Sequence, residues 1–481
     1  MQHRCLHGRS VPLFAAGVAV LLLPAAALPS SLPQIRVASD GRGFVTSAGE
    51  PWVAFGVNYF RPGTGWAPQV WRQFDAEATR RDFARLKEMG GNCVRVFLTY
   101  GSFYMERGRL APEGLAKFDR FLELAEEAGI YVHPTGPDHW EGLPDWARGD
   151  RIADETVLAA LEDFWKQFAA RYRGRRALFA YDLLNEPEVR WDTPAMKAKW
   201  QTWLQKQYGE PAKLARAWQR DSQGLEFSAA PVPPKDTAAG PELADYQRFR
   251  EDVADEWTRR QVAAIKAADP QALVTVGLIQ WSVPVNIAAA WHYSAFRPAR
   301  QAPLLDFMEI HFYPLANGFY EYREEDEPRN LAYLESVVRE VARFGKPVIV
   351  AEFGWYGGGQ PTIANGVHPF ASEEQQARWF RRAIETTAGL AHGWLNWSFH
   401  DHPGARDVTE FIGLLTADGR EKAAGRAFRE LAPRLVELSA RPPVLGDRPA
   451  LDWDRLIVDP KARREFSDRY LQAWRVDPGR R

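Results

Sequence analysis

The sequence predicts an α/β fold in which eight strand–helix units close into a barrel. Between residues 50 and 440, short apolar runs alternate with amphipathic stretches, which is the pattern of parallel βαβ units. There are eight such runs, and two of them end on a glutamate, Glu186 and Glu352. An open, doubly wound sheet would instead need a Gly-rich phosphate loop after an early strand, and the sequence has none. The barrel is therefore the preferred architecture.

The strands are expected where the apolar runs lie. In chain order they are Val53–Asn58, Asn92–Leu98, Ile130–Pro134, Leu178–Leu184, Leu273–Ile279, Phe307–Tyr313, Pro347–Phe353 and Trp394–Phe399. Apolar residues at helical spacing predict the intervening helices, as at Leu115, Phe118, Leu122 and Ala125 before Gly129 and at Val157, Leu161, Phe164 and Phe168 before Gly174. Ser372 and Gln375 form a capping box ahead of a later helix. In a (β/α)8 TIM barrel of this kind, active-site residues lie at the C-terminal strand ends.

Three segments are additions to the eight units. Phe44 to Val53 reads as a hairpin that plugs the N-terminal end of the barrel. A long insertion after the fourth strand, about residues 188–240, includes an amphipathic helix around Trp200 and is expected to wall the substrate cleft. Residues 441–481 form a tail that is helical around 461–474 and is not an independent domain. The catalytic domain is thus expected to span residues 28–440.

The first 27 residues have the pattern of a secretory signal peptide. A positive start is followed by the apolar run from Val11 to Leu23 and by the small residues Ala25 to Ala27. Its removal would leave Cys93 as the one cysteine, so no internal disulfide can form. We expect a secreted protein, extracellular or periplasmic, with no membrane association after cleavage and monomeric in solution.

Composition excludes several classes of function. The net charge is −1, which gives no electrostatic footprint for nucleic acid or an anionic membrane. The ten histidines are scattered, and no metal, phosphate-loop, nucleophile-elbow or dinucleotide motif is present, so no metal or cofactor is expected. The 19 tryptophans suit both a core and surfaces that stack on sugars.

The two glutamates at strand ends suggest the chemistry. A glutamate at the end of an apolar strand is costly to bury unless it is paired or used. Glycosidic-bond hydrolysis needs two such groups, one carboxyl to protonate the leaving oxygen and one carboxylate to attack. Glu186 and Glu352 are therefore the expected catalytic pair, and a carbohydrate the expected substrate.

The motifs around these glutamates resemble those of glycoside hydrolase family 5 and its clan A relatives, which include cellulases and β-mannanases. Asn185-Glu186-Pro187 after the fourth strand is similar to the acid/base motif, and Glu352-Phe353-Gly354 after the seventh to the nucleophile motif. The resemblance covers roughly residues 40–435. It implies that Glu186 is the proton donor, that Glu352 is the nucleophile, and that the enzyme retains the anomeric configuration.

Further residues are candidates for substrate binding. Arg95, expected inside the second strand, needs a carboxylate partner, and the resemblance places it beside Glu352. His311 and Tyr313 lie two apart on one strand and so share a face, which the family places near both glutamates. The other candidates include Asn58, Asn185, Trp397 and one of the histidines His133 and His139, with His133 preferred. Trp140, Trp281 and Trp355 each follow a strand and are expected as further sugar platforms. The resemblance implies that Trp397 floors the subsite next to the cleavage point.

The expected function is hydrolysis of a β-linked polysaccharide or oligosaccharide, with mannan slightly favoured over glucan. A transglycosylase would use the same two glutamates. A non-catalytic carbohydrate-binding barrel would typically lack one glutamate or the arginine, and all three residues are present here. A lyase or isomerase on the same barrel would usually need a metal, lysine or phosphate site at the strand ends, and none stands out.

Overall fold

The computed structural model describes residues 32–64, 67–221, 225–235, 240–285, 293–316, 323–362, 368–443 and 446–477. The proposed signal peptide, including the expected cleavage site after Ala27, lies outside the described residues. Among the described residues, no helix combines the length and the apolar character needed to cross a membrane.

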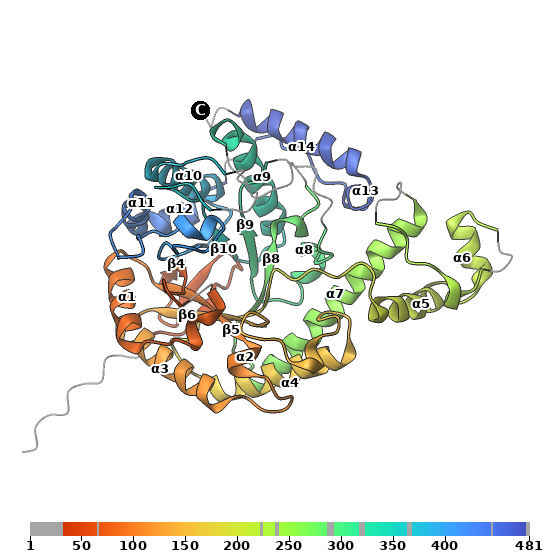
Figure 1. Ribbon diagram of the computed structural model, residues 1–481. Coiled ribbons are helices and arrows are strands. Elements are labelled where there is room, and N and C mark those ends of the chain that lie inside the picture. The colour runs from red at the N-terminus through yellow and green to blue at the C-terminus, as the bar shows by residue number, and fades with distance from the viewer. Residues whose placement is uncertain are drawn as a thin grey trace, which may run out of the picture. The chain divides into compact units, whose positions relative to one another are not determined.

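Eight parallel strands close into a barrel, as the sequence predicts (Figure 1). In chain order they are β4 (Ala54–Asn58), β5 (Cys93–Thr99), β6 (Tyr131–Asp138), β7 (Tyr181–Asn185), β8 (Val274–Ile279), β9 (Met308–Phe312), β10 (Val348–Phe353) and β11 (Gly393–Asn396). Each pairs with the next along the chain, and β11 pairs with β4 to close the ring. Nearly every strand residue is buried, because the interior is filled with side chains and helices cover the outside.

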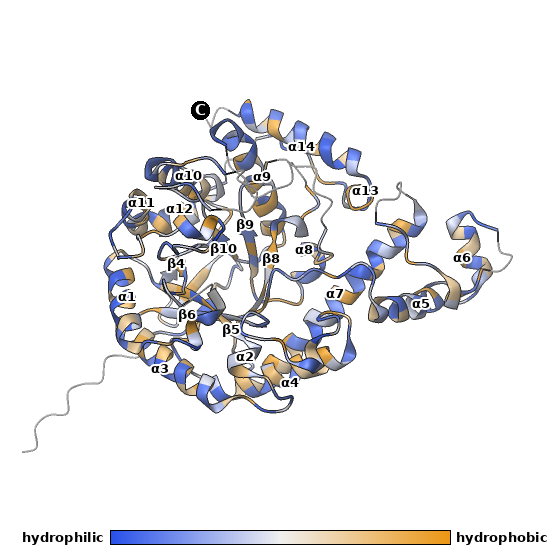
Figure 2. Cartoon of the chain, viewed as in Figure 1, coloured by the Kyte–Doolittle hydropathy of each residue, from blue (hydrophilic) through white to orange (hydrophobic). Residues whose placement is uncertain are grey.

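The helices that follow these strands are α1 (Ala76–Glu88), α3 (Pro112–Ala128), α4 (Glu155–Tyr172), α7 (Pro241–Ala268), the short α8 (Pro298–Gln301), α9 (Glu327–Ala342), α10 (Glu373–Thr387) and α11 (Ala423–Leu431). Ser372 and Gln375 make the expected reciprocal capping box at the start of α10. In Figure 2 the outer helices alternate hydrophilic and hydrophobic residues, as amphipathic helices on a barrel should.

A small antiparallel sheet closes the N-terminal end of the barrel. The expected hairpin is present as β2 (Phe44–Thr46) and β3 (Pro51–Trp52), and a further strand, β1 (Ile35–Val37), pairs with β2. The Phe44 ring lies 5.3 Å from both Phe179 and Phe307, and the Trp52 ring lies 4.7 Å from Phe179. We call these four rings the aromatic plug; they fill the space between the beginnings of the strands.

The insertion after β7 folds into α5 (Pro194–Tyr208) and α6 (Pro211–Trp218), and the expected amphipathic helix is α5. Both helices lie beside the N-terminal half of α7 and extend away from the strands (Figure 1). Trp203 Nε1 donates to Asp252, and Trp218 Nε1 and the Tyr208 hydroxyl donate to Asp245, both aspartates being on α7. The expectation that this segment walls the cleft is therefore wrong for α5 and α6, because α7 offers their apolar residues a closer surface.

The C-terminal tail contains α13 (Trp453–Leu456) and α14 (Pro460–Arg475), close to the expected helix. It packs on α9: Arg448 Nε donates to Glu335 at 2.8 Å, and Trp453 Nε1 donates to Glu340 at 2.7 Å. The Tyr470 hydroxyl donates to Glu335 at 3.0 Å. The tail is thus part of the same compact unit as the barrel.

Candidate active site

The two catalytic candidates meet at the C-terminal end of the barrel. Glu352 is the second-last residue of β10, and Glu186 directly follows the end of β7. One carboxyl oxygen of each, together with a ring nitrogen of His311, lies within 4.8 Å of the others. Glu186 has φ = 46°, a left-handed conformation that non-glycine residues rarely adopt and that tends to mark functional positions. Strands far apart in sequence therefore bring both carboxyl groups to one point.

Glu352 is held from two sides. Arg95 Nη1, from β5, donates to Oε1 at 2.5 Å, and the Tyr313 hydroxyl donates to Oε2 at 2.9 Å. Burial raises the pKa of Glu352, whereas His311, Arg95 and the Tyr313 hydrogen bond lower it; the nearby charge of Glu186 raises it again. The fixed orientation of this carboxylate suits a nucleophile, because neither oxygen has to be reoriented before attack.

Arg95 is fully buried and joins four strands. Besides Glu352, it donates to Asp182 Oδ2 at 2.7 Å, to Asn185 Oδ1 at 2.9 Å and to Asn58 Oδ1 at 2.9 Å. A buried guanidinium is tolerated only when its donors are matched by acceptors in this way. The sequence-based expectation that Arg95 contacts Glu352 is met in the structure.

His311 lies between the two glutamates. Its Nδ1 is 3.1 Å from Glu186 Oε1 and 3.6 Å from Glu352 Oε1, and its Nε2 is 3.2 Å from Glu309 Oε1. Burial lowers the pKa of the ring, but the charge of Glu352 and the hydrogen bonds to Glu186 and Glu309 raise it to about 10. Among the described residues, Glu186, His311 and Glu352 also have a spacing that could suit a metal ion. Arg95 and Tyr313 already donate hydrogen bonds to the two oxygens of Glu352, so we interpret the group as an acid–base site.

Asp182 and Glu309 belong to this site, although sequence reasoning missed them. Asp182 on β7 and Glu309 on β9 are fully buried and both contact Arg95. Gly277 on β8 makes room for Asp182 and for His311: a Cβ there would lie 2.8 Å from Asp182 Oδ2 and 3.1 Å from His311 Cε1. The missed signal was a carboxylate inside an apolar strand, which can be buried only with partners.

Two of the candidates are buried inside the barrel, where they form hydrogen bonds to residues of other strands. His133 is fully buried, with Nδ1 3.1 Å from the Ala180 carbonyl and Nε2 2.8 Å from Glu309 Oε2. Asn58 is also fully buried, and its Nδ2 donates to the Ala351 carbonyl at 2.7 Å. The expectation that these side chains reach substrate is not supported, because each is engaged within the barrel, below the catalytic carboxyl groups.

The four candidate tryptophans differ in accessibility. Trp140, after β6, is 41% exposed and stacks on the His139 ring at 4.5 Å, and Trp281, after β8, is half-buried. Trp397 packs with Tyr313, Phe60 and Phe97 in a cluster at the end of the barrel that holds the site. Trp355 is 1% exposed and packs on Tyr356 and His368, so its expected role as a sugar platform is not supported.

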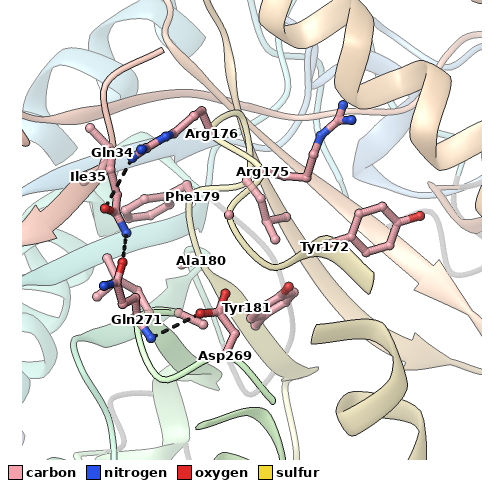
Figure 3. A pocket seen from close by; sticks show the side chains of 14 residues that line it. Gln34, Ile35, Tyr172, Arg175, Arg176, Phe179, Ala180, Tyr181, Asp269 and Gln271 are labelled. Atoms are coloured by element: carbon pink, nitrogen blue, oxygen red, sulfur yellow. Dashed lines mark hydrogen bonds between the residues drawn. The ribbon is translucent and has the colours of Figure 1, made fainter. Parts of the chain in front are cut away.

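A cavity of about 100 Å³ lies elsewhere, at the N-terminal end of the barrel (Figure 3). Gln34 Nε2 donates to Gln271 Oε1 at 3.2 Å, and Arg176 Nη1 donates to Gln34 Oε1 at 3.3 Å across it. Gln34, Gln271 and Arg176 thus already bind one another. The cavity is remote from Glu186 and Glu352 and takes no part in the site.

Comparison with known proteins gives a family match and several similar folds. A family model described as cellulase, glycosyl hydrolase family 5, matches residues 45–403. An exo-beta-1,4-mannosidase from Opitutaceae bacterium strain TAV5 aligns at 19% identity and TM-score 0.58, over 84% of this chain and 63% of that chain. A search of curated proteins found no match.

Two other solved structures resemble this chain to a comparable degree. A GH5_18 protein from Streptomyces cattleya in complex with GlcNAc aligns at 20% identity and TM-score 0.58, over 88% of this chain and 92% of that chain. A beta-galactosidase from Rahnella sp. R3 aligns at 18% identity and TM-score 0.65, over 92% of this chain and 64% of that chain. At these identities the likeness concerns the fold. This chain spans only about two thirds of the length of the mannosidase and of the galactosidase.

Proposed function

The chain belongs to glycosyl hydrolase family 5, and from that premise we propose that it is a retaining β-glycoside hydrolase that acts on β-mannosides. The observation that carries the retaining mechanism is the spacing of Glu186 and Glu352, whose nearest oxygens lie within 4.8 Å. Retaining enzymes have carboxyl groups about 5–5.5 Å apart, whereas inverting enzymes need about 6.5–9.5 Å to admit a water molecule. The short spacing therefore favours double displacement.

In the first step, a Glu352 oxygen forms a bond to the anomeric carbon while the glycosidic C–O bond breaks. Glu186 gives its proton to the departing oxygen and becomes a carboxylate. In the second step, Glu186 takes a proton from water, the water oxygen bonds to the anomeric carbon, and the Glu352 carboxylate leaves. One negative charge therefore moves from Glu352 to Glu186 and back.

The surrounding residues fit these steps. Tyr313 and Arg95 bind the nucleophile in its charged form, which keeps it oriented for attack. His311 faces both carboxyl groups, at 3.1 and 3.6 Å, so one cation can stabilise the negative charge in both halves of the reaction. The half-buried Asn185, with Oδ1 on Arg95, is placed for its amide to bind the sugar 2-hydroxyl.

The preference for mannosides comes from the similar solved structures. The similar structures include an exo-beta-1,4-mannosidase and a GH5_18 variant in complex with Manb1-4GlcNAc. At 19% and 21% identity, these proteins and this chain can differ in the sugar they accept, so glucan is the second candidate. Secretion is proposed from the N-terminal sequence pattern, and N-terminal sequencing of the mature protein tests it.

The decisive experiment combines a substrate panel with product stereochemistry. Wild type is assayed on β-mannan, manno-oligosaccharides, carboxymethyl cellulose, xylan and aryl β-glycosides, and the first product is followed by proton NMR. We expect hydrolysis of the mannosides with the β-anomer appearing first. Initial release of the α-anomer would exclude the retaining mechanism. Binding without cleavage of any member would favour the non-catalytic reading.

A further inference from the structure

Glu309 lies at the centre of a buried polar layer directly below the catalytic carboxyl groups. It is on β9, two residues before His311, and is fully buried. Its Oε2 is 2.8 Å from His133 Nε2, and its Oε1 is 3.2 Å from both His311 Nε2 and Arg95 Nε. Burial would raise the pKa of this carboxyl, but His133, His311 and Arg95 together hold it well below its usual range. Glu309 is therefore a carboxylate.

The two histidines that flank Glu309 are each surrounded by acceptors. For His311, Nδ1 faces Glu186 and Glu352, and Nε2 faces Glu309. For His133, Nδ1 faces the Ala180 carbonyl and Nε2 faces Glu309. A neutral imidazole has one donor and one acceptor nitrogen, so it would leave a lone pair against an oxygen in either tautomer. For His311, the doubly protonated ring satisfies the contacts on both nitrogens.

The other charged groups around His311 do not replace Glu309. Arg95 is a cation and opposes a charge on the ring, and Asp182 is directed at Arg95 and at the Gly277 amide. Glu352 and Glu186 both contact Nδ1 and exchange their charge during the reaction. Among the described residues, Glu309 is the carboxylate that contacts Nε2, and it takes no part in the chemistry.

We propose, building on the glycosidase function above, that Glu309 is a positioning residue that keeps His311 cationic throughout the catalytic cycle. By accepting the Nε2 proton, it fixes the ring with its Nδ1–H toward the two catalytic carboxyl groups. His133 in turn fixes Glu309 from below. The charge of His311 is thus independent of which catalytic glutamate is ionised at a given moment.

The test measures the protonation of His311 directly. Protein labelled with ¹⁵N-histidine is titrated by NMR, and the His311 signals are assigned by their loss in His311→Asn. In wild type we expect both ring nitrogens to stay protonated through pH 8. In Glu309→Gln, which keeps the shape but removes the charge, we expect the ring to titrate about 3 or more pH units lower, below pH 7. Retention of both protons in Glu309→Gln at pH 8 would overturn the proposal.

A kinetic measurement gives the functional readout. An aryl glycoside with a dinitrophenolate leaving group departs without a proton, so the acid role of Glu186 does not limit its rate. We expect kcat/KM of Glu309→Gln to stay within about fivefold of wild type at pH 5 and to fall by more than about tenfold at pH 8. Glu309→Asp, which keeps the charge, should largely restore the alkaline activity. An equal loss at every pH would mean a structural role only.

Controls separate this inference from folding and from the proposed function. Glu335→Gln neutralises another fully buried glutamate, bound to Arg448 and Tyr470 far from the site, and should leave the pH profile unchanged. If Glu309→Gln does not fold, the wild-type titration still decides, because loss of a His311 proton at or below pH 8 contradicts the proposal. If no glycoside is hydrolysed, the proposed function fails while the NMR titration still tests Glu309.

Discussion

Arg95 and Glu352 are joined across the barrel by a 2.5 Å contact between Nη1 and Oε1, and both side chains are buried. The same guanidinium binds Asp182 and Glu309, so one cation faces three carboxylates from three strands. Ion pairs of this kind are weak evidence for stability, but removal of one partner leaves the others uncompensated. The site is therefore a set of mutually dependent charges.

Replacement of Arg95 should lower the stability of the fold. Arg95→Met leaves three buried carboxylates without their cation, and we expect the free energy of unfolding to fall by about 3–5 kcal/mol. Urea unfolding measured by fluorescence and circular dichroism tests this. An Arg95→Met protein as stable as wild type would show that neighbouring groups take up protons at little cost.

The two catalytic glutamates should respond differently to truncation. Glu186→Ala should still cleave an aryl glycoside with a good leaving group, because its first step needs no acid, and azide should accelerate the second step. Glu352→Ala should lose more than about a thousandfold in kcat/KM on every substrate. The configuration of the glycosyl azide identifies the two roles. Glu186→Ala should give a product of retained configuration, and Glu352→Ala one of inverted configuration. The opposite pattern would exchange the assignments.

Loss of the Tyr313 hydroxyl should change the pH profile. The hydrogen bond from Tyr313 lowers the pKa of Glu352, so Tyr313→Phe raises that pKa. Glu352 is then ionised only at higher pH, and the acidic limb of kcat/KM moves toward neutrality. A hydrogen bond to a charged group is worth about 1.5–3 kcal/mol, so we expect a loss of roughly 10- to 100-fold. A pH–rate profile with an unmoved acidic limb would contradict this.

Trp140 and Trp355 form a matched pair of aromatic residues, one after β6 and the other after β10. Trp140→Ala should raise KM about tenfold with little effect on unfolding, because the ring is 41% exposed. Trp355→Ala should lower the free energy of unfolding by about 3–5 kcal/mol, because that ring is buried. Thermal unfolding and steady-state kinetics on an oligosaccharide distinguish the two. A stable Trp355→Ala protein with a raised KM would restore the sugar-platform expectation.

His392 should make the fold sensitive to acid. Burial lowers the pKa of this ring to about 4, and its Nδ1 accepts a hydrogen bond from the Val348 amide at 3.2 Å. The unfolded chain therefore binds more protons between pH 6.5 and 4, and stability is lost as the pH falls through that window. His392→Asn keeps an acceptor but cannot titrate, and should remove a loss on the order of 2–3 kcal/mol. Urea unfolding at pH 7 and pH 4.5 measures the difference.

Much of the fold could be predicted from the sequence because a parallel barrel is built from short-range patterns. All eight strands lie within a few residues of the expected runs, and the carboxyl ends of two of them bear the expected glutamates. β6 runs on to Asp138 beyond the expected end at Pro134, since pairing of Thr99 with Asp138 continues the strand. The direction of α5 and α6 could not be predicted, because it depends on which surface of α7 receives their apolar residues.

The site was predicted where a residue has a distinctive local context and missed where its role depends on distant partners. Arg95, His311 and Tyr313 lie on expected strands with the correct spacing. Glu309 and Asp182 lie inside apolar strands, and only closure of the barrel shows that Arg95 and His133 satisfy them. The sequence predicts His133 in the cleft, because how deep its side chain lies in the barrel cannot be judged from sequence.

The aromatic plug determines how water reaches the centre of the barrel. The rings of Phe179 and Phe307 lie 5.6 and 6.0 Å from the His133 ring, directly beneath the buried charges. This apolar floor leaves the mouth as the route for hydrogen exchange with bulk solvent, and Glu186, with a quarter of its side chain accessible, lies there. Protons deep in the layer are thus separated from solvent by the catalytic acid itself. The rate of hydrogen–deuterium exchange at the imidazole N–H groups would measure how often that entrance opens.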